Sequence, residues 1–229
     1  MMYTNVNLAA PIGVLAFLGA ASLLLVAGLV LIYSLLTKKP RIGKLSAISI
    51  AVIACVYLSV MLIFSVASSK TALARGQEKH FCEIDCHLAY SIIDVSQSKT
   101  LGESAKQTTA AGLYHVVTIK TRFDETTISP TRGNGLLYPN SRVLTVIDEN
   151  GRVFYPSPEA QHSLEQSRGA DTPMTAPLRP TESYTSRFVF DLPADVRNPV
   201  LLISEAEWVT HFVIGHENSL WHKKTAFQM

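Results

Sequence analysis

Two long uncharged apolar runs constrain this chain more than any other feature of its sequence. No charged side chain occurs from Met1 to Thr37 or from Leu45 to Ser69, and each apolar run is about 25 residues long. About 20 apolar residues suffice for a helix to cross the hydrocarbon core of a bilayer. We therefore predict a transmembrane hairpin within residues 1–69, with helices at 12–36 and 45–69 and a loop at 37–44.

A cleaved signal peptide is the alternative interpretation of the first run. Signal peptides begin with a positively charged region, and their apolar stretch is about 7–15 residues long. The residues before Ile12 carry no positive side chain, and the apolar run that follows is longer than such a stretch. The first run is therefore interpreted as a retained helix.

The loop between the two runs is basic and sets the expected orientation. It contains four cations and no acid, and the predicted cytoplasmic anchors are Lys38, Lys39, Arg41 and Lys44. Short loops rich in lysine and arginine are normally retained in the cytoplasm. We therefore expect a two-pass topology in which residues 70–229 lie outside the cytoplasm.

The chain from Lys70 onward is close to neutral. It carries sixteen lysine and arginine residues against eighteen aspartate and glutamate residues. Proteins that bind nucleic acids carry clustered positive charge, and this sequence has no basic tract or nucleic-acid-binding motif. The composition therefore excludes nucleic acid as a predicted partner and leaves the lipid bilayer as the partner of the apolar runs.

After a polar tether at 70–80, residues 81–229 have the composition of a β domain. Strands favour β-branched and aromatic residues in short runs that are separated by turn residues. Such runs occur at 88–96, 114–123, 142–157, 182–193, 198–204 and 207–215. Short strands at this spacing predict an antiparallel sandwich.

Local signals add a hairpin and one helix to this domain. Asn150-Gly151 lies between two apolar runs, which is the strongest short-range signal for a hairpin. Ser157-Pro158 predicts the start of a helix, and Gly169 predicts its end. The predicted core consists of Val117, Ile119, Val146, Phe154, Phe188, Phe190, Leu202 and Val213. Exposed apolar positions are expected to be few unless one sheet face docks on a partner.

A family resemblance rests on the middle of this domain. The "DENGRVFYPS" hairpin, the short helix and the stretch "LRPTESYTSRFVFDLP" resemble an uncharacterised group of bacterial membrane-anchored extracytoplasmic immunoglobulin-like (telokin-like) domains. The resemblance covers most of residues 88–204, and the stretch "IGHENSLWHKKTAF" is also similar. It implies an immunoglobulin-like fold on the extracytoplasmic side of a bacterial inner membrane, and it implies no catalytic residue.

Cys82 and Cys86 lie in the stretch "HFCEIDCHLAYS", which contains two cysteines, two histidines and two carboxylates within twelve residues. Disulfides persist outside the cytoplasm, which is where the topology places these residues. A bridge requires Cα atoms within about 7 Å, whereas residues four apart on a strand are about 13 Å apart. The segment must therefore curl into a turn, and we predict a disulfide between the two cysteines.

The alternative is a soft-metal or thiol-redox site. Cu(I) prefers thiolates, and the candidate ligands are Cys82, Cys86, His80 and His87. Two helices followed by a β domain also resemble the copper-bearing subunit of haem–copper oxidases, but Tyr90 stands where the histidine of that subunit's C-x-x-x-C-x-x-x-H motif is expected. A copper-handling or thiol-redox role in the respiratory membrane is therefore the second hypothesis.

Other catalytic patterns do not match this sequence. Haem attachment needs two residues between the cysteines, and here there are three. His216, Glu217 and His222 do not have the H-E-x-x-H spacing of zinc proteases, and no G-x-S-x-G motif occurs. We therefore predict a non-enzymatic, membrane-tethered binding or structural module without a cofactor, contacting another envelope or membrane protein.

Overall fold

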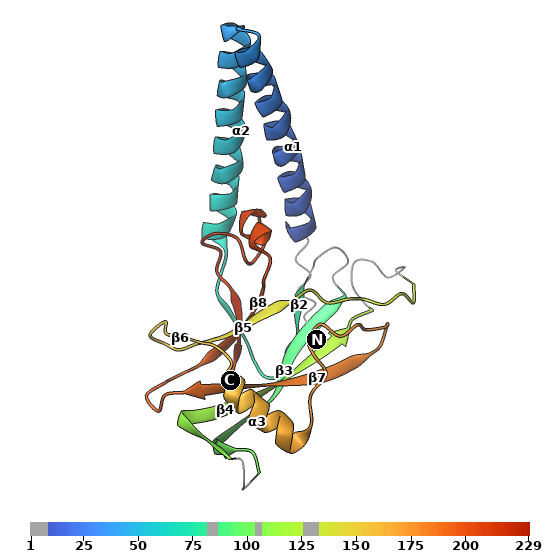
Figure 1. Ribbon diagram of the computed structural model, residues 1–229, viewed down its shortest axis with the longest axis vertical. Helices are drawn as coiled ribbons and strands as arrows, with labels where there is room; N and C mark the ends of the chain where they lie inside the picture. The colour runs from blue at the N-terminus through green and yellow to red at the C-terminus, as the bar shows by residue number, and fades with distance from the viewer. Residues whose placement is uncertain (1–8, 82–86, 104–106, 126–132) are drawn as a thin grey trace. The chain divides into compact units, whose positions relative to one another are not determined.

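The computed structural model describes residues 9–81, 87–103, 107–125 and 133–229. Two long helices come first, and the strands and two further short helices follow (Figure 1). Contacts divide the chain into two compact units. The first unit contains Lys70–Ala206 and Lys224–Met229, and the second contains Asn7–Ser69 and Glu207–Lys223.

The helical hairpin consists of α1 (Ala9–Leu36) and α2 (Pro40–Ala67), which pack against each other. Both helices are long and apolar enough to span a membrane. The turn between them is shorter than predicted because α2 already begins at Pro40. Proline fits the first helical position, because the N–H of that position has no partner within the helix. The Ser46 hydroxyl donates a hydrogen bond of 2.5 Å to the Ala27 carbonyl and joins the two helices.

The first unit contains two sheets. The five-stranded sheet has the order β1-β9-β8-β5-β6, and the four-stranded sheet has the order β2-β3-β4-β7. The strands are β1 (Thr71–Leu73), β2 (Lys79–Phe81), β3 (Leu88–Leu101), β4 (Thr108–Phe123), β5 (Arg142–Ile147), β6 (Val153–Phe154), β7 (Ser183–Leu192), β8 (Val200–Glu205) and β9 (Thr225–Gln228). Neighbouring strands are antiparallel except β1 and β9, which are parallel.

One apolar core joins the two sheets face to face. Tyr90, Ile119 and Phe190 from the four-stranded sheet and Val146 and Ile203 from the five-stranded sheet are fully buried in it. This arrangement confirms the predicted fold class, two apolar helices followed by a β-sandwich. Of the predicted core, the buried members of this cluster are Val117, Ile119, Val146 and Phe190, with Phe154 and Phe188 packed against it.

The outer face of the four-stranded sheet is covered by α3 (Pro158–Arg168), the helix that the sequence predicts. Ser157 caps this helix by accepting a hydrogen bond from the Ala160 N–H, and Gly169 follows its last residue with a φ of 80°. Leu164 of the helix packs with Val189 of β7 in a second, smaller apolar cluster. The sandwich therefore has one outward face shielded by a helix.

Two stretches differ from the sequence-based expectation. The predicted tether at 70–80 contains β1 and the start of β2. The strand predicted at 207–215 is wrong, because this stretch forms the 3-10 helix η1 (Trp208–Phe212) and belongs to the same unit as the long helices. Its β-branched and aromatic composition resembles that of a strand, but Val213 is buried within the helical unit and not in the core of the sandwich.

Candidate functional site

The cysteine-rich stretch follows directly after β2. β2 and β3 are antiparallel neighbours, and Phe81 lies opposite Leu88. Cys82 and Cys86 fall in the connection between these strands, outside the described residues. The predicted disulfide and the alternative thiolate ligands therefore stay predictions, and the described residues around the connection define its setting.

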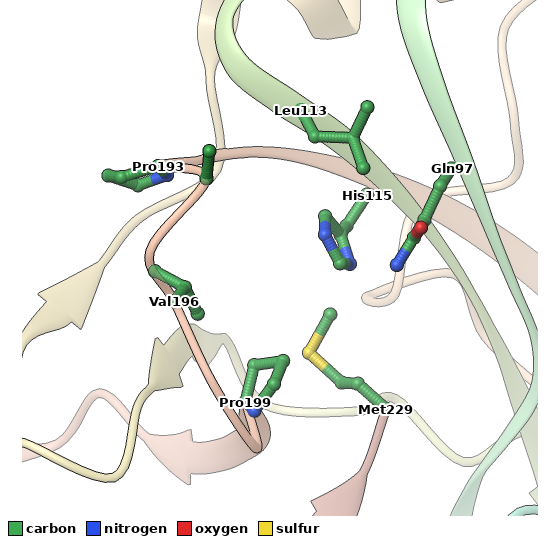
Figure 2. A pocket seen from close by; sticks show the side chains of 8 residues that line it. Gln97, Leu113, His115, Pro193, Val196, Pro199 and Met229 are labelled. Atoms are coloured by element: carbon green, nitrogen blue, oxygen red, sulfur yellow. The ribbon is translucent and has the colours of Figure 1, made fainter.

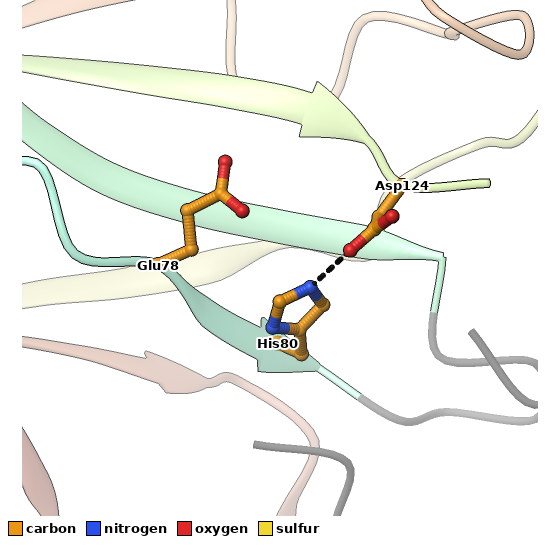
Figure 3. Close-up of side chains that lie close together, drawn as sticks. All are labelled: Glu78, His80 and Asp124. Atoms are coloured by element: carbon orange, nitrogen blue, oxygen red, sulfur yellow. Dashed lines mark hydrogen bonds and ion pairs between the residues drawn. The ribbon is translucent and has the colours of Figure 1, made fainter. Parts of the chain in front are cut away.

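His80 lies at the centre of a charged cluster formed by Glu78, His80, Arg122 and Asp124. β2 carries His80, and Asp124 directly follows β4, so strand pairing through β3 brings them together. The His80 Nε2 atom lies 2.7 Å from an Asp124 carboxylate oxygen (Figure 3), and both side chains are almost completely buried. Asp124 therefore orients the imidazole.

Arg122 joins the two acids of the charged cluster. Its guanidinium donates two hydrogen bonds of 2.7 Å to the Glu78 carboxylate and lies 3.2 Å from Asp124. Hydrogen bonding to Arg122 lowers the pKa of Glu78, and the same bond raises the pKa of Arg122. Bidentate pairs of this kind are strong, so the charged cluster holds the residue before β2 against the end of β4.

The charged cluster has metal-binding groups but also an internal cation. One ligand atom each from Glu78, His80 and Asp124 lies within 4.8 Å of the others. The permanently charged Arg122 pairs with both carboxylates, so a metal ion would bring a second cation next to this guanidinium. The Nδ1 atom of His80 is buried and has no hydrogen-bond partner among the described residues. The charged cluster is therefore best explained as a structural clamp with one unused imidazole nitrogen.

His87, the second histidine of the motif, has a packing role. It is buried, its ring stacks on Phe123 with centroids 4.8 Å apart, and its Nδ1 atom lies 2.5 Å from the Asp124 carbonyl oxygen. The backbone N–H of Asp124 in turn donates to the His87 carbonyl. These contacts fix the first residue after the cysteine connection against the end of β4.

A pocket opens at another place in the sandwich (Figure 2). Its volume is about 230 Å³, which is below the usual 300–1,000 Å³ of drug-sized ligand sites. His115 and Gln97 are its polar side chains, and burial lowers the pKa of His115, so the imidazole is neutral near pH 7. Its Nδ1 atom is buried without a hydrogen-bond partner in the described part of the chain. The pocket is suited only to a small, mostly apolar molecule.

The outward face of the five-stranded sheet is apolar. Strand register places Val143, Thr145, Ile147 and Val153 on it, and these residues together with the exposed Tyr155, which directly follows β6, define the β5–β6 face. Three of these are well exposed, at 37% for Val143, 47% for Val153 and 66% for Tyr155. Leu202, which was predicted for the core, instead lies opposite Thr145 on this outward side and is only 9% exposed, so it adds no exposed surface. Exposed apolar side chains that gather on one face commonly mark an interaction site.

The remaining predicted residues have ordinary local contacts. Of the four predicted anchors, Lys38 and Lys39 lie in the turn of the hairpin, whereas Arg41 and Lys44 lie in the first turns of α2. Cys55 is a free, exposed thiol on α2. In the turn after η1, the Nδ1 atom of His216 accepts a hydrogen bond from the Asn218 N–H.

Sequence reasoning missed three members of the charged cluster and the whole β5–β6 face. Glu78 and Arg122 are 44 positions apart, as are His80 and Asp124, so no local motif connects them. The β5–β6 face had a usable signal, because apolar residues occupy both alternation phases of "RVLTVI". A strand with one face in water normally alternates apolar and polar residues.

Comparisons with known proteins give no family for this chain. No protein-family model and no curated protein matches it. A secreted protein from Mycobacterium tuberculosis, MPT63, matches with a TM-score of 0.42 and 14% identity, covering 72% of this chain and 100% of that chain. A conserved hypothetical protein from Bacillus anthracis matches with a TM-score of 0.40 and 13% identity, covering 58% and 89%. The telokin-like resemblance therefore stays a prediction.

We expect Cys82 and Cys86 to be bridged in the exported chain. Alkylation of the denatured full chain should modify one thiol, Cys55, before reduction and all three thiols after it, because the bridge blocks the other two. Intact-mass spectrometry measures both states, and elemental analysis should find no stoichiometric metal. Stoichiometric copper that disappears in the Cys82→Ser, Cys86→Ser double variant would contradict this expectation.

Proposed function

We propose that this protein is a non-enzymatic binding module, anchored in a bacterial inner membrane by two helices, whose sandwich docks another envelope protein outside the cytoplasm. The orientation follows from the basic turn of the hairpin, since short basic loops stay in the cytoplasm. The binding role follows from the β5–β6 face, which is the single observation that carries the proposal.

The two outward faces of the sandwich differ in how far they are covered. On the four-stranded sheet, α3 shields apolar side chains such as Tyr114 and Val189 from water. On the five-stranded sheet, Val153 and Tyr155 point outward while Phe154 between them packs on the core. When a partner covers an apolar and well exposed sheet face, the burial of apolar surface makes the free energy of binding more favourable.

A protein surface is the occupant that this chemistry favours. Interfaces between proteins combine an apolar centre, enriched in aromatic residues, with a polar rim. Tyr155 provides the aromatic side chain, and Arg152, the residue before Val153, provides a rim position. Arg152 forms ion pairs of 2.7 Å with Asp148 and 2.9 Å with Asp195. The partner we propose therefore presents an apolar surface with polar groups at its edge.

Site-specific photocrosslinking tests this proposal in native membranes. With a photoreactive phenylalanine in place of Tyr155, irradiation of cells should yield one discrete adduct to another envelope protein. The matched control places the same residue at Thr185, an exposed position on β7 of the four-stranded sheet. Adducts of equal yield at the two positions, or a Tyr155 adduct to lipid or to a second copy of this chain only, would contradict the proposal.

The second candidate function is copper handling or thiol-redox chemistry by the cysteine pair. One observation favours it: His80, two positions before Cys82, is oriented by Asp124, and its buried Nδ1 atom has no hydrogen-bond partner among the residues that the structure describes. An imidazole of this kind is able to ligate a soft metal or to take a proton from a thiol. The elemental analysis described above separates copper handling from the binding module.

A further inference from the structure

We infer that residues 207–223 lie at the membrane surface as part of the membrane unit, with Trp208 and Trp221 inserted among lipid headgroups. The contacts of this segment already group it with the long helices. In Figure 1, η1 lies between the ends of α1 and α2 that are remote from the basic turn. The inference adds a lipid-contacting site that is distant in sequence from either apolar run.

Hydrogen bonds attach the segment to the second long helix. The Tyr57 hydroxyl donates to the Phe212 carbonyl at 2.6 Å, and the Lys223 N–H donates to the Ser68 hydroxyl at 2.8 Å. The helix rises 1.5 Å per residue, so Tyr57 is about 15 Å along the axis from Ala67. The segment therefore contacts α2 both just after its last residue and at Tyr57, ten residues before that end.

The first long helix also makes room for the segment. A Cβ atom added at Gly13 would lie 1.9 Å from the Ile214 carbonyl oxygen, a distance that no packed structure allows. Glycine at this position therefore permits close approach between α1 and the segment. Gly19, six residues further along α1, has no such neighbour within 4 Å among the described residues.

The segment satisfies much of its own backbone, as non-helical chain at membrane depth must. The Thr210, Val213, His216, Ser219, Leu220 and His222 N–H groups donate to carbonyls within the segment. The Ser219 hydroxyl donates to the Val213 carbonyl, and the Asn218 amide donates to the Thr210 hydroxyl at 2.9 Å. This local hydrogen bonding lowers the cost of leaving water.

The exposed side chains have the chemistry of a membrane interface. Trp208 and Trp221 are 71% and 72% exposed, and Phe212 and Leu220 are also exposed. Tryptophan is enriched where headgroups meet the hydrocarbon, because its ring is apolar and its N–H needs a polar partner. Trp221 also has a φ of 60°, an unfavourable conformation for a large side chain that the fold nevertheless keeps. Lipid contact explains why both indoles face outward.

Intrinsic fluorescence tests the inference without a label, because the chain contains two tryptophans and both lie in this segment. We expect the full chain in phosphatidylcholine vesicles to lose most of its emission when the lipids carry bromine near the headgroup. Aqueous iodide should quench it weakly. Strong iodide quenching with no effect of brominated lipid would place both indoles in water and overturn the inference.

Glycine variants supply matched controls for the same measurement. In Gly13→Ala the added methyl group meets the Ile214 carbonyl, so the segment should be displaced and iodide quenching should rise. In Gly19→Ala quenching should equal that of the unmodified chain, because the methyl group meets open space. Equal quenching in the two variants would show that the segment does not pack against α1 as inferred.

Discussion

A cysteine introduced at Asn150 is expected to react with a membrane-impermeant maleimide in intact spheroplasts, whereas one at Lys39 is expected to react only after the membrane is broken. Asn150 is exposed in the β5–β6 turn, and Lys39 lies in the basic turn between α1 and α2. Short basic loops are retained in the cytoplasm, which places the other side of the hairpin outside. The effect should be close to all-or-none at both positions.

The labelling must start from a chain without reactive thiols of its own. Replacement of Cys55, Cys82 and Cys86 by serine provides this background, and the unreactive parent measures the remaining signal. Full labelling of the Lys39 cysteine in intact spheroplasts, with protection of the Asn150 cysteine, would show that the topology is the reverse of the predicted one. It would also remove the compartment argument for a disulfide, because cytosolic thiols stay reduced.

Replacement of Glu205 by alanine is expected to lower the free energy of unfolding of the sandwich by about 3–5 kcal/mol, the usual cost of breaking a buried ion pair from one side. The Glu205 carboxylate lies 3.4 Å from the Arg142 guanidinium, and the Arg142 side chain has no solvent exposure. Arg142 also stacks over the Phe81 ring, with the guanidinium carbon 4.3 Å from the centroid. Without Glu205, a fully buried guanidinium loses this ion pair and keeps its permanent positive charge inside the sandwich.

A surface ion pair provides the control for this prediction. Arg152 pairs with Asp195 at 2.9 Å, but Asp195 is 68% exposed. Asp195→Ala should therefore cost only about 0–1 kcal/mol. Pulse proteolysis of the full chain in detergent, across a urea series, measures both variants through the surviving sandwich fragment. Equal losses for Glu205→Ala and Asp195→Ala would show that burial does not strengthen the Arg142–Glu205 pair.

The elements that were predictable from sequence are those whose signals are local. Asn150-Gly151 specifies its hairpin within a few residues, and Gly151 has the positive φ that such a turn needs. Ser157 and Gly169 mark the ends of α3 in the same way. The apolar runs are predictable for the same reason, because a span is defined by continuous composition.

The features that escaped prediction depend on contacts between distant residues. Glu78 and Arg122 meet only because β2 and β4 both pair with β3. The stretch from Trp208 to Phe212 has strand-like composition, but its neighbours are the long helices, and tertiary contacts override propensity. No window of sequence contains the information about either set of neighbours.

The parallel pairing of β1 with β9 makes assembly of the sandwich depend on a strand that begins only at Thr225. β1 is the first strand after α2, yet Thr71 pairs with Thr225 and Leu73 with Phe227. A ribosome must therefore add almost the entire domain before β1 finds its neighbour, and such long-range pairing slows folding. Chains released before residue 225 would leave β1 and the edge of β8 unpaired, exposed to proteases and to aggregation. The first strand of the domain thus stays unpaired until one of its last strands has been synthesised.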